Sequence, residues 1–147
     1  MKKSILIIFI PIAIIISSVC GLIIEKNSNS RIIKRQNSEY EYYLDKEIIG
    51  TDLISLINKS INKNEENRIQ KDEKGRYIEN EINSIKIEVR MLIKEKKYKT
   101  YPMEEIYKND TTEFLKNFNF VKFKCTSIEY HKNTGFVKKL LFEEIEN

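Results

Sequence analysis

Few residues of this sequence could carry out chemistry, and histidine is the scarcest of them. Hydrolysis of the triad type needs a histidine within reach of a nucleophile, and the chain has a single one, His131. Ser127 and Cys125 lie near it in the sequence, but no glycine-rich turn accompanies them. The residues around His131 are typical of a turn between strands. We therefore predict an exposed turn histidine that can be replaced without loss of folding.

Metal and acid–base sites are also predicted to be absent. One histidine and one cysteine beyond the apolar N-terminal run cannot supply three zinc ligands without carboxylates. Adjacent carboxylates point apart on a helix or strand, and the chain has three such pairs, Glu65–Glu66, Glu104–Glu105 and Glu143–Glu144. No phosphate-binding glycine motif is present. The sequence predicts no catalytic, cofactor-binding or metal residue, and a protein that is not an enzyme.

A basic run with aromatic residues comes nearest to a nucleic-acid surface. It contains Lys94, Lys96, Lys97, Tyr98, Lys99 and Tyr101. After the apolar run, however, the chain carries 24 basic and 22 acidic side chains, a net charge of +2, which is a mixed-charge surface. We expect a solvated loop over residues 94–100 and no nucleic-acid partner. An anionic envelope polymer or the bilayer surface is the alternative partner of this loop.

The N-terminal apolar run is predicted to be a transmembrane helix over residues 4–24. It has no charged side chain from Ser4 to Ile24, and about 31 Å of helix matches a hydrocarbon core of about 30 Å. The alternatives are a cleaved signal, whose apolar core is normally shorter, and a lipoprotein signal, which would need a small residue where Val19 stands. Residues 1–3 are then a cytoplasmic tail, and the C-terminal part lies outside the cell membrane.

Small residues form a stripe on this predicted helix. Ala13, Ser17 and Gly21 are spaced four apart, and Cys20 lies beside them. Small stripes let membrane helices approach closely. We name these four residues as a candidate contact with a second copy or with another membrane protein; the alternative is a chance arrangement. Cys125 is the single cysteine beyond the run, so it cannot form an intradomain disulfide and is expected to be a small buried apolar residue.

The rest of the chain predicts a stalk or helix extension over residues 25–45 and an α+β domain over residues 46–147. Residues 51–64 have the apolar period of a helix after Gly50, with Thr51 or Asp52 as its cap. Ile85, Ile87, Val89 and Met91 alternate as in a strand, which residues 76–82 could join as a hairpin across residues 80–84. Gly75 is the expected turn before it.

A second helix is expected from Pro102 to Phe118, and residues 110–112 could divide it into two short helices. Two strands then flank a turn at residues 131–135. The sum is an antiparallel sheet of three or four strands packed against two helices. The aromatic residues Tyr40, Tyr42 and Tyr43 are expected to pack on this domain.

Three stretches, KEIIGTDLISLINKSINKN, NSIKIEVRM and FKCTSIEYHKNTGFVKKLLFEEIE, resemble a group of uncharacterised short single-pass membrane proteins of AT-rich Gram-positive bacteria. The resemblance implies a setting beside pilus-like or secretion-like machinery and carries no functional residue. The expected function is a non-enzymatic, membrane-anchored accessory or structural component of a cell-envelope assembly. The alternative is a tethered ligand-binding domain or small enzyme, which a pocket larger than about 300 Å³ with convergent polar groups would favour.

Overall fold

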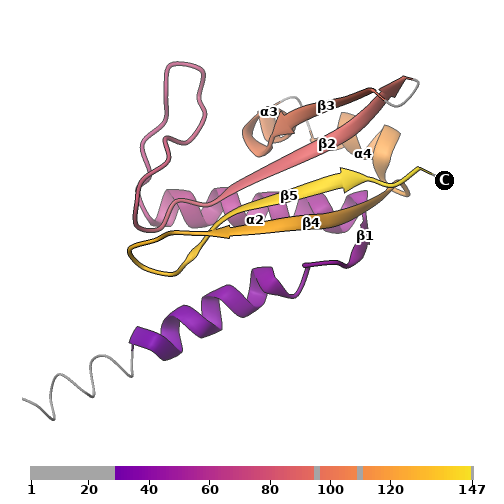
Figure 1. Cartoon of the computed structure of the whole chain (residues 1–147). Helices are drawn as coiled ribbons and strands as arrows, with labels where there is room; N and C mark the ends of the chain where they lie inside the picture. Colours follow the sequence, from indigo (N-terminus) through magenta and orange to yellow (C-terminus); the bar gives the residue numbers. More distant parts are fainter. Residues whose placement is uncertain (1–28, 95–96, 109–110, 147) are drawn as a thin grey trace, which may run out of the picture. The chain divides into compact units, whose positions relative to one another are not determined.

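A computed structural model describes residues 29–94, 97–108 and 111–146 (Figure 1). The chain divides into two compact units, Met1–Arg35 and Gln36–Asn147. The predicted transmembrane helix and its stripe of Ala13, Ser17, Cys20 and Gly21 lie outside the described residues. Within the described ranges, no helix has the length and apolar character needed to cross a membrane. The second unit includes residues 36–45, which we expected to belong to a stalk.

The second unit is α+β, and its sheet has five strands. Their spatial order is β1 (Glu47–Ile49), β4 (Lys122–Tyr130), β5 (Val137–Glu144), β2 (Lys86–Lys94) and β3 (Lys97–Pro102). All neighbours are antiparallel except β5 and β2, which run parallel. The expectation of an antiparallel sheet of three or four strands was therefore wrong. Local patterns predict hairpins, whereas the parallel pair joins segments that are distant in sequence.

The partner of β2 also differs from the prediction. Residues 97–100 of the basic run, which we expected to be a loop, belong to β3, where Lys99 pairs with Met91 and Tyr101 with Val89. Residues 76–82 form no strand beside β2. Because β3 is an edge strand, its lysines can point into water while its backbone pairs on one side only. The alternation that we used to recognise strands requires a buried face, which residues 97–100 lack.

Three helices cover one face of the sheet, α2 (Gly50–Glu66), α3 (Met103–Lys108) and α4 (Thr111–Phe118) (Figure 1). The predicted division of the second helix into two is confirmed. The cap prediction for α2 was wrong: Ile49 is the N-cap residue, without a side-chain cap bond. Strand β1 leads directly into the helix, and the Gly50 amide donates instead to the carbonyl of Val121 at 3.1 Å.

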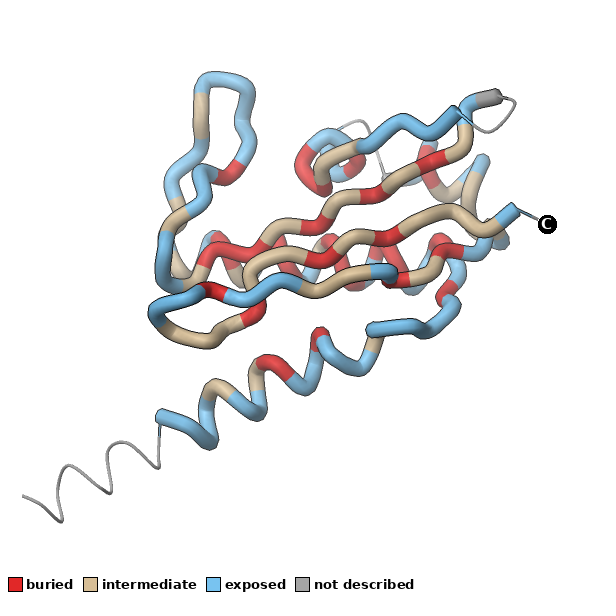
Figure 2. The backbone as a smooth tube through the Cα atoms, viewed as in Figure 1, coloured by how far each residue is buried: buried red, intermediate tan, exposed pale blue. Residues whose placement is uncertain are grey.

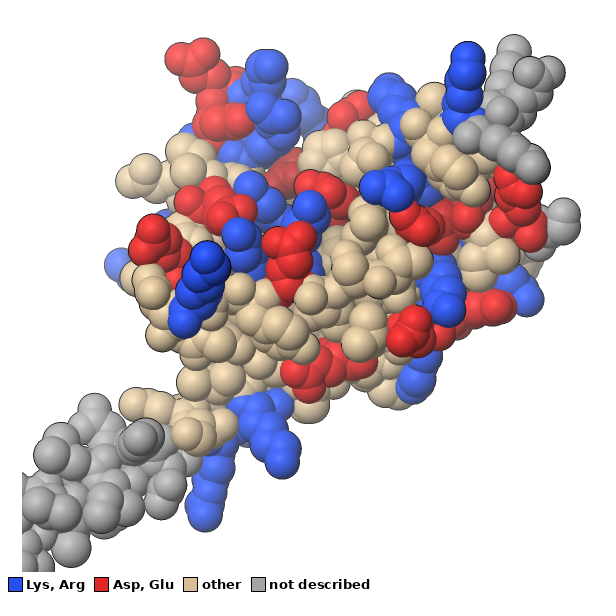
Figure 3. Space-filling model, in the orientation of Figure 1, with Lys and Arg blue, Asp and Glu red and all other residues tan. Residues whose placement is uncertain are grey.

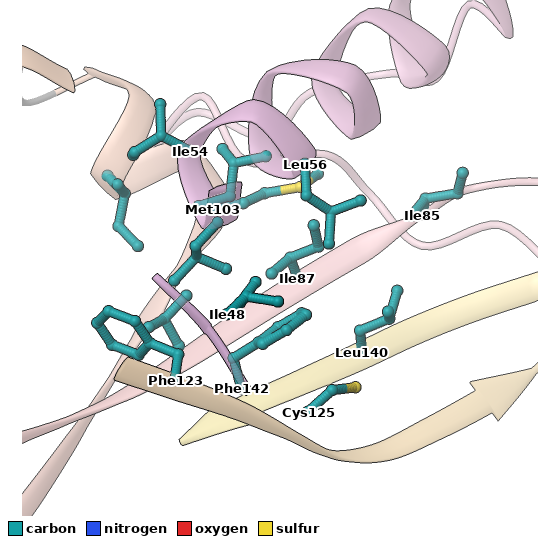
Figure 4. Packing of buried hydrophobic residues seen from close by; sticks show 14 of the residues in the cluster. Ile48, Ile54, Leu56, Ile85, Ile87, Met103, Phe123, Cys125, Leu140 and Phe142 are labelled. Carbon is teal, nitrogen blue, oxygen red and sulfur yellow. The ribbon is translucent and has the colours of Figure 1, made fainter. Parts of the chain in front are cut away.

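The core lies between these helices and the sheet. Buried residues alternate along the central strands (Figure 2), and Ile85, Ile87, Val89 and Met91 are all buried as their spacing predicts. Figure 4 shows Ile87 near Leu140 and Phe142 of β5, on the side of the sheet that faces Leu56 of α2. The C-terminal hairpin of β4 and β5 is confirmed. Together, these side chains form one continuous hydrophobic cluster.

Cys125 belongs to this core, as expected. Its side chain is fully buried, and burial raises the pKa of the thiol to about 11. The thiolate that reacts with electrophiles is therefore scarce at neutral pH. Cys125 acts as a small packing residue.

The segment before β1 is held against the domain. Residues 36–41 complete a helix, from which Tyr40 is only 5% exposed. The side-chain amide of Asn37 donates to the carbonyl of Gly135 at 2.8 Å and accepts from the amide of Val137 at 2.9 Å. The Tyr43 ring packs edge-on against Phe142, whereas Tyr42 is exposed. The expected packing of tyrosines is therefore confirmed for Tyr40 and Tyr43.

Charged side chains of both signs are interspersed over the face shown in Figure 3. Lys139 lies 3.0 Å from Glu88 and 3.7 Å from Glu129, and Arg90 pairs with Glu143 across β2 and β5. Exposed pairs of this kind contribute little stability. They do leave this face without a patch of one sign, in line with the small net charge.

Candidate functional site

His131 is buried, so the prediction of an exposed turn histidine was wrong. It is 3% exposed, and its Nε2 atom lies 2.8 Å from the carbonyl oxygen of Ser84. A carbonyl can only accept, so Nε2 carries the hydrogen. The backbone amide of His131 also donates to the carbonyl oxygen of Phe136. The connection between α2 and β2 packs against this hairpin, and its Ser84 carbonyl needs a hydrogen-bond donor. The side chain of His131 lies inside because it supplies that donor.

We now expect His131→Ala to destabilise the fold. The change removes a buried ring and leaves the Ser84 carbonyl without its donor, which together cost about 1 to 3 kcal/mol. Urea unfolding of the full chain in detergent micelles, followed by circular dichroism, measures this. Lys132→Ala, at the exposed neighbouring position, is the control and should change little. Equal stability of the two variants would restore the view that His131 is dispensable.

Among the described residues, a cleft of about 870 Å³ opens at the C-terminal end of α2. It lies between residues 71–77 and α3, not between the sheet and the helices. Its wall is formed by Ile61, Lys71, Lys74, Gly75, Arg76, Tyr77, Pro102, Glu104, Glu105, Tyr107 and Lys108. We call this opening the cleft. It exceeds the size of about 300 Å³ at which pockets accommodate small molecules, and its lining is rich in polar groups.

One wall of the cleft is a projecting loop, residues 70–78, which we call the arm (Figure 1). Its two sides are joined by hydrogen bonds from the Asp72 amide to the Arg76 carbonyl at 2.8 Å and from the Ile78 amide to the Gln70 carbonyl at 2.8 Å. Gly75 turns the chain with φ of +79°, a conformation that favours glycine. The turn predicted at Gly75 is confirmed.

Tyr77 fixes the arm to the body of the domain. Its side chain is 3% exposed, and its backbone amide donates to Oε1 of Glu104 on α3 at 3.0 Å. The phenol donates to Oε1 of Glu65 on α2 at 3.2 Å, and burial raises the pKa of Tyr77, which keeps this donor protonated. Two helices thus hold one arm residue, and the cleft has a fixed floor.

Asp72 organises the tip of the arm. Its Oδ1 atom accepts from the backbone amides of Lys74 and Arg76 at 2.9 and 2.8 Å, and Oδ2 accepts from Nε of Arg76 at 3.1 Å. These hydrogen bonds, and most of all the one from the backbone amide of Arg76, hold the pKa of the Asp72 carboxyl below its ordinary value. Asp72 therefore stays ionised and orients the guanidinium of Arg76.

Asparagine side chains brace the rest of the connection between α2 and β2. Asn64 is fully buried on α2; its amide nitrogen donates to the Ile85 carbonyl at 2.7 Å, and its oxygen accepts from the Ile85 amide at 2.8 Å. The oxygen of Asn80 accepts from three successive amides, those of Ile82, Asn83 and Ser84. These bonds fix an irregular segment, residues 67–85, that has no helix or strand of its own.

In two of the three carboxylate pairs, the neighbouring side chains have different surroundings. Glu104 is buried and Glu105 exposed, so the two point apart as predicted. In the C-terminal pair, Glu143 bonds Arg90 and Glu144 accepts from the amide of Leu92. Among residues 29–94, 97–108 and 111–146, no group of three or more metal-binding side chains is found.

Sequence reasoning missed the cleft and the arm. The signals were present as Asp72, Gly75 and Arg76 in a charged stretch, from which we predicted only the turn at Gly75. A turn closed by an Asp side chain is visible in sequence, whereas the contact of Tyr77 with Glu104 joins positions that no local pattern connects. Residues 97–101 of the basic run that we considered instead lie on β3, outside the cleft lining. Comparison with protein-family models, curated proteins and solved structures finds no match.

Proposed function

We propose that this protein is a non-enzymatic, membrane-anchored binding component of a cell-envelope assembly, with its α+β domain outside the membrane. The anchor is the uncharged run from Ser4 to Ile24. The domain works by holding a ligand or a partner's group in the cleft. The single observation that supports binding is the cleft itself, about 870 Å³ in volume and lined by charged and phenolic side chains.

The segment that builds the cleft supports the same proposal. Connections longer than about 12 to 15 residues without helix or strand are uncommon in small domains and are usually functional, and residues 67–85 form such a connection. A segment that only closed the chain would not need Tyr77 fixed to two helices and Asp72 fixed to Arg76. These bonds hold the cleft open before a ligand arrives, which lowers the ordering cost of binding.

The positions of the candidate catalytic groups favour binding over turnover. His131 and Cys125 are buried in the core and engaged with backbone atoms. Glu104, the buried carboxylate of the cleft, already accepts a hydrogen bond from the arm. Its first role is therefore to position Tyr77.

Cysteine labelling of intact cells tests both parts of this proposal. Tyr107→Cys places a thiol in the cleft lining, and Lys116→Cys places one on the exposed face of α4. Both carry Cys20→Ser, while the buried Cys125, with its pKa of about 11, stays unreactive. With a membrane-impermeant maleimide we expect both thiols to react from outside. The measured quantity is the labelling rate of Tyr107→Cys divided by that of Lys116→Cys. We expect this ratio to be several-fold lower in cells than after extraction into detergent, because the cleft is occupied in cells.

Two results would contradict the proposal separately. If neither thiol reacts until the cells are lysed, the domain lies inside. If both react from outside with the same rate ratio in cells and in detergent, the cleft is empty in its native setting and the binding role fails.

A further inference from the structure

The cleft presents more unengaged positive than negative charge. Within the described part of the chain, neither Lys74 nor Lys108 has an ion-pair partner, and both line the cleft. Lys71 is 3.4 Å from Glu65 and lies over the ring of Tyr77. The carboxylate of Glu104 is turned to the arm backbone. Glu105 is the one acidic side chain of the lining without a bond to another described residue.

Arg76 gives this positive charge a defined direction. Asp72 bonds its Nε atom, and the part of the chain that the structure describes offers no ion-pair partner to the two terminal nitrogens of the guanidinium, which keep their donors. A planar guanidinium held in place loses less entropy on binding an oxyanion than a free side chain does. The backbone bond from Arg76 to Asp72 at 2.8 Å and the positive φ of Gly75 fix the same turn. The tip of the arm is therefore ordered for binding.

The donors belong to opposite walls. Lys74 and Arg76 stand on the arm, and Lys108 ends α3 across the cleft. A carboxylate offers two oxygens in one plane, whereas a phosphate ester offers oxygens in a tetrahedral arrangement that donors on two sides can share. A long nucleic-acid chain is disfavoured because Glu104 and Glu105 interrupt the positive lining and such partners favour continuous basic surfaces. The carboxylate of Glu105 suits a hydroxyl group beside the phosphate.

We infer that the cleft binds a phosphate ester with a hydroxylated substituent, held by Lys74, Arg76 and Lys108. This inference rests on the proposed binding role of the same cleft and names the chemistry of its ligand. The phosphate could belong to a lipid headgroup or to a free or polymeric ester, because both present the same group to the cleft.

A fluorescence titration tests the inference, since the chain contains no tryptophan. Tyr107→Trp places the only one in the cleft lining. The full chain is placed in phosphatidylcholine nanodiscs and titrated with glycerol 3-phosphate, inorganic phosphate, glycerol or acetate. We expect saturable changes with both phosphates, a tighter one with glycerol 3-phosphate, and none with glycerol or acetate. Lys74→Gln combined with Lys108→Gln should weaken binding about tenfold or more, whereas Lys116→Gln combined with Lys132→Gln should leave it unchanged.

The source of the phosphate is decided by changing the nanodisc. A fluorescence change with phosphatidylglycerol discs, abolished by the paired cleft substitutions, assigns the phosphate to a headgroup; a response only to soluble ester assigns it to a free or polymeric ligand. Acetate binding as tightly as phosphate, or no response to any phosphate, overturns the inference. After either result, the cysteine protection experiment still tests the proposed binding role, because it does not depend on the nature of the ligand.

Discussion

Asn64→Ala is expected to lower the free energy of unfolding by about 3 kcal/mol, because it removes two hydrogen bonds to buried backbone groups. In the native fold the Asn64 side chain bonds both the amide and the carbonyl of Ile85, as a neighbouring strand would. Ile85 immediately precedes β2. Urea unfolding of the full chain in detergent micelles measures the loss.

Asn62→Ala is the matched control, on the same helix but at an exposed position. Its effect should stay within about 0.5 kcal/mol. Hydrogen exchange adds a local measurement: the Ile85 amide should lose protection in Asn64→Ala at urea concentrations where the helices remain folded. If both substitutions cost the same, the buried amide bonds contribute nothing specific, and the connection between α2 and β2 is held by other contacts.

Gly50→Ala is expected to destabilise the fold by about 3 kcal/mol, the upper range for overpacking, because the new methyl group meets backbone atoms that cannot rotate away. A Cβ atom at this position would overlap the carbonyl oxygen of Phe118 and lie 2.7 Å from its carbonyl carbon. The end of α4 would have to move, and with it the stacked rings of Phe114 and Phe118. Thermal and urea unfolding measure the effect.

The sign of this effect is informative. Replacing a helical glycine with alanine normally stabilises a helix by about 0.5 to 1 kcal/mol, so a loss isolates the close contact between α2 and the end of α4. Thr51→Ala, at the next and exposed position, should change stability by less than about 0.5 kcal/mol. A Gly50→Ala variant as stable as the parent would mean that α4 is not packed against the start of α2.

Local periodicity was sufficient for much of the fold. The apolar stripe of α2 and the alternation from Ile85 to Met91 each require a buried face, and both are buried. The hairpin of β4 and β5 follows from two β-rich runs around a glycine-containing turn. These elements could be predicted because the spacing of the apolar residues in each one shows which of its faces is buried.

Elements whose environment is set from elsewhere could not be predicted. Strand β3 has no buried run to mark it and exists because β2 offers an unpaired edge. His131 looked like a turn residue, and only the position of Ser84 shows why it is buried. No local pattern marks Asn37, Asn64 or Asn80, yet the side-chain oxygen of each accepts a hydrogen bond from a backbone amide that lies far away or in an irregular segment. The same limit hid the candidate site, since the arm and α3 are far apart in sequence.

The central place of β5 dictates when the sheet can be completed. The two hairpins, β2 with β3 and β4 with β5, each join neighbours in the sequence, but the parallel register of Ile87 with Leu140 and Val89 with Phe142 spans some fifty residues. Closing a loop of that length is slow compared with forming a hairpin. Until β5 pairs with β2, the apolar faces of the two half-sheets stay uncovered. A chain that is synthesised or translocated from its N-terminus also keeps the apolar residues of α2 exposed during that time. Folding rate and chaperone dependence should therefore respond to substitutions in the β2–β5 seam far more than to equal changes on β3.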